Sequence, residues 1–206
     1  MVKVINLSAS TIGLLLLFTH ILASITVGII FRFWKSKNKE KRNTDVINNN
    51  ITFNSLGEIL SKSIISAINS VVLIGGFIIL FGIILSILQK TSILNLLKIP
   101  LLPIFNLLNI KTEFIIPIFT GILELTNGLA TISSIPNPNL AINIIISAFL
   151  LGFGGISIML QVLSITSKSD ISIKPYILGK LLQGLLAAFF TFLIINRFSY
   201  FDYLCI

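Results

Sequence analysis

Long apolar runs constrain the fold of this chain more than any other feature of its sequence. Of the 206 residues, 55 % are hydrophobic and 11 % are charged, and the mean hydropathy is +1.02. Several runs could form a helix of about 20 residues, the length that crosses about 30 Å of hydrocarbon. They lack the strict alternation of outer-membrane strands. The sequence therefore predicts an all-α, polytopic protein of the cell membrane, in contact with the lipid bilayer.

The positive charge of the chain is concentrated in one stretch. The formal net charge is +8, and one short segment holds six of the cations: Arg32, Lys35, Lys37, Lys39, Lys41 and Arg42. A basic patch can bind nucleic acid, but this one directly follows a hydrophobic span and has no aromatic residue among its cations after Trp34. The positive-inside rule accounts for it as a cytoplasmic loop, and no nucleic-acid partner is expected.

Charge and hydropathy divide the chain into four parts. Residues 1–34 contain an N-terminal span at 12–33, residues 35–54 form the basic cytoplasmic linker, residues 55–198 form the main membrane domain, and residues 199–206 form a tail. A signal peptide is the alternative for the first span, but we expect a membrane helix, because its cations follow the apolar run and no small-residue cleavage site is present. We expect the N-terminus to lie outside.

The main domain begins with a helix start signal. Ser55 and Glu58 have capping-box spacing, and Glu58 is placed to pair with Lys62 one turn later. An apolar stripe over 55–69 predicts a helix on the membrane surface, after which the chain turns into a second span at 71–88. Three glycines in that span permit close contact with another helix: Gly75, Gly76 and Gly82.

The segments that follow are interrupted. Prolines and Lys98 break the run 91–111, which predicts an interfacial or partly re-entrant segment. Residues 114–132 form the next apolar segment, 135–139 a turn, and 140–166 another segment. The glycines within 152–155 predict a break in it, because glycine costs a helix about 1 kcal/mol relative to alanine. Pro175 opens the last span, 175–195.

Polar residues recur at helical spacing in three of these segments. Thr120, Glu124 and Asn127 would line one face of a continuous helix, with Pro117, Gly121 and Gly128 as points where that helix could bend. Glu124 is the only acidic side chain inside a long apolar run. It either serves a solute or ion site or holds a neighbouring helix by a hydrogen bond.

The other two stripes lie on the segments that follow. Ser157, Gln161 and Ser164 form one, and Tyr176, Lys180 and Gln183 form the other. Lys180 either extends to the membrane surface or faces the interior of the bundle. Polar stripes on broken helices are typical of transporters, where half-helix ends meet at a solute site.

Several chemical functions find no support in the sequence. We find no nucleophile with a base, no phosphate-binding loop and no set of metal ligands, so neither enzymatic activity nor a metal or cofactor is expected. Cys205 is the single cysteine, and His20 is the single histidine. We interpret His20 as a residue of helix packing or of the membrane interface.

The motif Pro117-x-Phe119-x-Gly121-x-x-Glu124-x-Thr126-x-Gly128 resembles the core of the nucleoside-recognition (Gate) domain. The chain is similar to the sporulation integral membrane proteins that carry this domain. Further matching stretches cover nearly the whole chain: 19–34, 74–81, 148–157, 161–162, 174–176 and 180–184. In the family, the basic residue of this last stretch is usually arginine-like and can bind in a bidentate way. Lys180 instead offers a point charge.

This resemblance implies a function in endospore formation. Members move dipicolinic acid, a small anionic solute, from the mother cell towards the forespore, which implies the mother-cell or outer forespore membrane. The implied solute-path residues are Thr120, Glu124, Thr126, Asn127, Gly128, Gln161 and Lys180; the polar stripe adds Ser157. Full members are about twice as long, so the chain corresponds to the C-terminal half of a Gate-type inverted-repeat transporter. Its expected partner is the missing half or a second copy.

Two other functions remain open at this point. The chain could be a membrane component that does not transport but assembles with, or regulates, another sporulation protein. It could also be an inactive fragment of a split or truncated transporter. Neither the coupling ion nor the topology of 91–166 follows from the sequence.

The basic linker gives the first testable prediction. Because its cations oppose translocation, cysteines introduced at Ser36 and Asn49 should resist an impermeant thiol reagent in intact cells. They should react once the membrane is permeabilised, which serves as the control, and Cys205 is replaced beforehand. Ready labelling in intact cells would reverse the expected orientation.

Overall fold

The computed structural model describes residues 8–32, 55–91, 93–107, 110–135, 140–166 and 172–204. The linker 35–54 and the turn residues 136–139 lie outside the described residues. Every regular element of the described part is helical. The elements are α1 (Ala9–Arg32), α2 (Leu56–Lys90), α3 (Ile93–Leu107), the 3-10 turn η1 (Thr112–Phe114), α4 (Ile115–Leu123), α5 (Leu125–Ser133), α6 (Leu140–Phe153), α7 (Gly155–Thr166) and α8 (Lys174–Leu204).

Four described segments are long and apolar enough to cross a membrane. They are Ala9–Arg32, Leu56–Lys90, Leu140–Thr166 and Lys174–Arg197. The predicted all-α, multi-pass fold is thereby confirmed. The third segment lies at the centre: half of its most apolar window is buried inside the protein, against 11 % for the first two.

Helix α2 confirms its predicted start but not its predicted turn. The Ser55 hydroxyl accepts a hydrogen bond from the Glu58 N–H, and Glu58 pairs with Lys62 at 2.7 Å. The helix then continues unbroken for 35 residues, about 52 Å at 1.5 Å per residue. Nothing between 55–69 and 71–88 breaks it, and the Ser70 hydroxyl donates within the helix to the Ser66 carbonyl. The length exceeds the hydrocarbon thickness of about 30 Å, and residues 55–69 continue the direction of 71–88. The predicted turn from a surface helix into the second span is therefore wrong, because no proline or chain break interrupts the helix.

Helix α3 lies within the predicted segment 91–111, whereas α8 extends beyond the predicted span 175–195. Helix α3 includes Pro100 and Pro103 and spans 15 residues, too few to cross a bilayer. Helix α8 starts at Lys174, with Pro175 in its first turn, and its backbone continues to Leu204. The predicted tail at 199–206 therefore begins as part of this helix.

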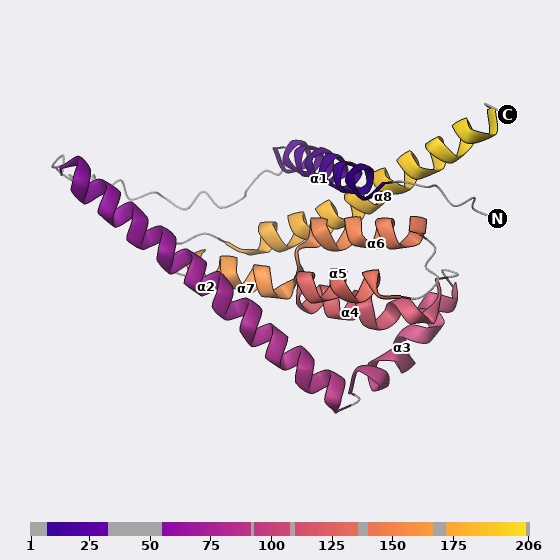
Figure 1. The fold of residues 1–206 in the computed structure, drawn as a ribbon, viewed down its shortest axis with the longest axis horizontal. Helices are drawn as coiled ribbons and strands as arrows, with labels where there is room; N and C mark the ends of the chain where they lie inside the picture. The colour runs from indigo at the N-terminus through magenta and orange to yellow at the C-terminus, as the bar shows by residue number, and fades with distance from the viewer. Residues whose placement is uncertain are drawn as a thin grey trace.

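Two groups of helices meet at α6. Figure 1 shows α4, α5, α6 and α7 in the middle of the molecule, with α1 and α8 along one side and α2 and α3 along the other. Helix α6 packs most extensively against α8 and also contacts α1, α4 and α5. Helix α2 touches mainly α7 and α3, and much of its apolar surface is exposed.

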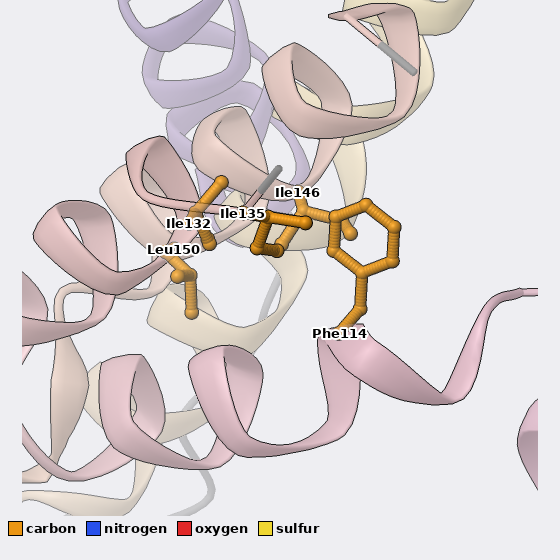
Figure 2. Close-up of a cluster of buried hydrophobic side chains, with 5 residues drawn as sticks. All are labelled: Phe114, Ile132, Ile135, Ile146 and Leu150. Atoms are coloured by element: carbon orange, nitrogen blue, oxygen red, sulfur yellow. The ribbon is translucent and has the colours of Figure 1, made fainter. Parts of the chain in front are cut away.

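A cluster of large apolar side chains joins the middle helices. Figure 2 shows Phe114, Ile132, Ile135, Ile146 and Leu150 in mutual proximity, all with less than 10 % of their surface exposed. Phe114 ends η1, Ile132 lies near the end of α5, Ile135 follows that helix, and Ile146 and Leu150 lie on α6. This packing holds α5 against α6, as expected for two helices that flank a short connection.

Glycines set the distance between α6 and α8. A Cβ atom on Gly152 would lie 2.7 Å from the Gly184 Cα and 2.9 Å from the Gln183 carbonyl oxygen. A Cβ atom on Gly184 would lie 2.9 Å from the Phe149 carbonyl oxygen. Only glycine allows this approach, because the backbones themselves are in contact.

Replacing Gly152 should therefore destabilise the bundle. We expect Gly152→Ala to lower the free energy of unfolding by about 1–3 kcal/mol, the usual cost of overpacking, and to lower the melting temperature followed by circular dichroism. Gly82→Ala is the control, because no atom lies within 4 Å of the added methyl and alanine favours a helix. Equal melting temperatures for the two variants would contradict a tight α6–α8 contact.

Candidate functional site

Two chain breaks interrupt the central helices. Helix α4 ends at Leu123 and α5 begins at Leu125, with Glu124 between them in an extended conformation (φ −143°, ψ 120°). Helix α6 ends at Phe153 and α7 begins at Gly155. Gly154 and Gly155 have φ angles of +84° and +83°, which favour glycine. The second break lies within the predicted stretch 152–155, but the first lies at Glu124 itself.

The two breaks pack directly on one another. A Cβ atom on Gly155 would lie 3.2 Å from the Gly121 carbonyl oxygen and 3.4 Å from the Leu125 nitrogen. The backbone that starts α7 therefore lies against the end of α4 and the start of α5. Helix ends carry peptide groups without partners in the helix, so unpaired N–H and C=O groups are concentrated here.

Glu124 serves as the N-cap of α5. Its buried carboxylate accepts hydrogen bonds from the backbone N–H groups of Thr126 (3.0 Å) and Asn127 (2.8 Å). It also accepts from the Thr126 hydroxyl (2.7 Å) and the Asn127 side-chain amide (2.8 Å). An anion at a helix N-terminus is stabilised by these N–H groups and by the helix dipole.

This geometry changes the interpretation of the Glu124 motif. The spacing of Thr120, Glu124 and Asn127 predicted one face of a continuous helix, which is wrong because the helix breaks at Glu124. The structure instead joins Glu124 to Thr126 and Asn127, whose side chains are largely exposed. Gly128 allows α5 to fold back on α4, since a Cβ atom there would overlap the Gly121 Cα.

Thr120 lies one turn before the first break. It is fully buried, and its carbonyl accepts the Glu124 N–H at 2.8 Å. Its hydroxyl has no hydrogen-bond partner in the described part of the chain. A buried hydroxyl without a partner is costly, which makes this position a candidate for contact with a ligand.

Helix α7 contributes a second polar pair. Ser157 and Gln161 are buried, and the Gln161 amide donates to the Ser157 hydroxyl at 3.4 Å. Ser157 lies two residues after the start of the helix, near the second break. Ser164 continues the predicted stripe and is half-buried.

Lys180 faces the bundle interior and reaches the second break from α8. Its half-buried ammonium lies 3.5 Å from the Gly152 carbonyl oxygen and 3.3 Å from the Gln183 side-chain oxygen. A Cβ atom on Gly154 would lie 3.9 Å from it. The structure therefore favours the interior position over extension to the membrane surface. In the described residues, the ion pairs are Glu58–Lys62 and Glu113–Lys111, and Lys180 does not pair with Glu124.

The structure also brings His20 to this site, which the sequence did not indicate. The Gln183 amide nitrogen lies 3.4 Å from His20 Nε2, across 163 residues of sequence. No local pattern signals such a contact. Within the described residues, no three His, Cys, Asp or Glu side chains are grouped so that they could hold a metal ion.

Comparison with known proteins identifies a relative by sequence but no matching solved structure. No protein-family model matches the chain, and no solved structure matches it. The chain is similar to the sporulation integral membrane protein YlbJ of Bacillus subtilis (strain 168), with 32 % identity over 206 aligned residues. The match takes in 90 % of this chain and 49 % of the relative, so the chain spans about half the length of that curated protein. The chain is thus a multi-pass homologue of an integral membrane sporulation protein.

The cap formed by Glu124 predicts an unequal response to two substitutions. Glu124→Ala leaves two partly buried backbone N–H groups of α5 without an acceptor, which should cost about 1–3 kcal/mol of stability. Glu124→Gln should cost less, because its oxygen can occupy the position that accepts three of the four hydrogen bonds.

Thermal unfolding of the detergent-solubilised protein measures the difference. Glu113→Ala is the matched control: Glu113 is exposed and pairs with Lys111 at 3.3 Å, and exposed ion pairs contribute little. If Glu124→Ala melted like the control, the carboxylate would not be holding the break together.

Proposed function

We propose that this chain forms the solute-binding part of a membrane transporter that acts in endospore formation. We propose further that the solute is a small dicarboxylate of the dipicolinic acid type. The observation that carries the proposal is the contact between two helix breaks inside the bundle, at Gly155, Gly121 and Leu125. Transporters bind solutes at such meeting points of half-helices. Homology to an integral membrane sporulation protein supports the biological setting, and the Gate-domain resemblance supports the solute.

The second break has the chemistry to receive a carboxylate. Lys180 places a positive charge beside Gly154, and α7 begins at the next residue. The N-terminus of α7 offers N–H groups and the positive end of its dipole. The buried Ser157 hydroxyl lies in the first turn of the same helix and can supply a further donor.

The first break carries the opposite charge, which must not repel the solute. Two unit charges about 4 Å apart interact by about 4 kcal/mol at an effective dielectric of 20. Four donors surround the Glu124 carboxylate, so the start of α5 already compensates its charge. We assign two roles to Glu124: it holds the shape of the break, and it couples solute movement to the transport cycle. We assign the binding of the anion to Lys180.

The alternative is a membrane component that assembles with another protein without transporting. The observation that favours it is the surface of α2, where no atom of the described residues lies within 4 Å of a Cβ placed on Gly75, Gly76 or Gly82. A second helix could approach there. In the transport proposal the same surface faces a second half, supplied by another chain or another copy.

The breaks distinguish the two functions. In spores whose single copy of this protein is a variant, Lys180→Met should lower dipicolinate accumulation at least tenfold, which corresponds to about 1.4 kcal/mol of solute binding. Glu124→Gln should also abolish accumulation while the protein remains folded. Lys90→Met is the control, because Lys90 is exposed at the end of α2.

Protein abundance is measured alongside by immunoblot. Normal dipicolinate in spores with Lys180→Met or Glu124→Ala, at normal abundance, would favour the non-transporting component. The central motif would then be structural.

A further inference from the structure

A chain of three polar side chains connects α1 to the second break. It runs from His20 on α1, through the Gln183 amide on α8, to the Lys180 ammonium beside the end of α6. We infer that Gln183 and His20 are positioning residues that aim Lys180 at the break, where the ammonium binds a carboxylate of the solute. This inference rests on the proposed function and adds α1 to its site.

The surroundings of Lys180 point to a missing anionic partner. An ammonium has three donors, and charge-assisted bonds to oxygen are normally about 2.7–2.9 Å long. The two acceptors of Lys180 lie at 3.3 and 3.5 Å, and the described residues provide no third. A charge in a membrane-spanning helix requires strong partners. These weak contacts leave the positive charge of Lys180, next to Gly154 and the start of α7, without a strong partner in the described residues.

Gln183 can position Lys180 in only one orientation of its amide. Because an ammonium only donates, the amide oxygen must face Lys180, and the amide NH₂ then faces His20 Nε2. That nitrogen must accept, so it carries no proton in this arrangement. The proton of the neutral ring is on Nδ1, which is buried without a partner in the described residues.

Protonation of His20 would reverse this arrangement. An imidazolium carries N–H on both nitrogens, so the Gln183 oxygen would have to turn towards His20 and present NH₂ to Lys180. The ammonium would then lose the acceptor that aims it at the break. Lys180 on α8 is the titratable group that faces His20, and α6, the other helix packed on α1, contains no titratable residue.

Helix packing alone does not explain His20. The α1–α8 contact already has its own hydrogen bond, from the Thr191 hydroxyl to Thr19 at 3.1 Å, and both threonines are fully buried. Ala23 and Ala187 pack in the same contact. Thr19→Val therefore provides a control that weakens this contact without touching Lys180.

Equilibrium binding tests the inference. The probe is radiolabelled pyridine-2,6-dicarboxylate, and the full chain is held in lipid nanodiscs between about pH 8 and pH 5.5, where an imidazole takes up a proton. We expect the Kd of the unaltered protein to rise at least threefold as the pH falls. Gln183→Leu should raise the Kd at least tenfold at pH 8. His20→Gln should keep an acceptor for Gln183 and remove the pH dependence, whereas Thr19→Val should lower only the melting temperature.

Each further outcome decides between the claims. If Gln183→Leu and His20→Gln bind as tightly as the unaltered protein with the same pH profile, while Lys180→Met binds weakly, the positioning roles are wrong and the proposed site stands. If Lys180→Met changes nothing, or the unaltered protein does not bind the probe, the proposed site fails and the inference with it. Gln183→Met replaces Gln183→Leu if the latter does not fold.

Discussion

The structure depends on how a membrane protein pairs the backbone groups that are left free where a helix breaks. Hydrocarbon offers no partners for N–H and C=O groups, so irregular backbone survives at membrane depth only under a cover of protein or beside a wet cavity. Here each break covers the other: Gly155 lies against the end of α4 and the start of α5. The Glu124 carboxylate accepts hydrogen bonds from the N–H groups of Thr126 and Asn127 at the start of α5. The bundle can thus contain a polar centre, and the described residues need no continuous aqueous path to accommodate it.

Close helix contacts keep this centre in place. The backbone approach of α6 to α8 at Gly152 and Gly184, and of α5 to α4 at Gly128 and Gly121, leaves no room for a side chain. The apolar cluster around Leu150 and Phe114 packs α4, α5 and α6 together. Helix α1 belongs to this assembly although a long linker separates it in sequence, because Thr19 and His20 bond to α8. The division into an N-terminal span and a separate membrane domain is therefore one of sequence and not of packing.

The half-length match to the sporulation integral membrane protein YlbJ fits the uneven burial of the helices. The α6–α7 segment is deeply buried, whereas α2 exposes most of its surface along 35 residues. Exposed apolar surface in a membrane protein faces lipid or another helix. The glycines of α2, predicted to permit close contact, have no neighbour within 4 Å of an added Cβ among the described residues. Under the proposed function, they mark where a second half would pack.

The membrane class, the long apolar helices, the Ser55 cap and the break near Gly154 can all be predicted from the sequence. These features depend on local properties: the hydropathy of a run, the hydrogen bond of one side chain to a nearby N–H, and the conformational freedom of glycine. By contrast, the position of the first break at Glu124 and the inward direction of Lys180 depend on tertiary contacts. The tertiary structure alone brings His20 to Gln183 and Gly155 to Gly121. The spacing of Thr120, Glu124 and Asn127 fits an unbroken helix equally well, and the break is stabilised by contacts with α7 that are distant in sequence. Local periodicity cannot encode such contacts.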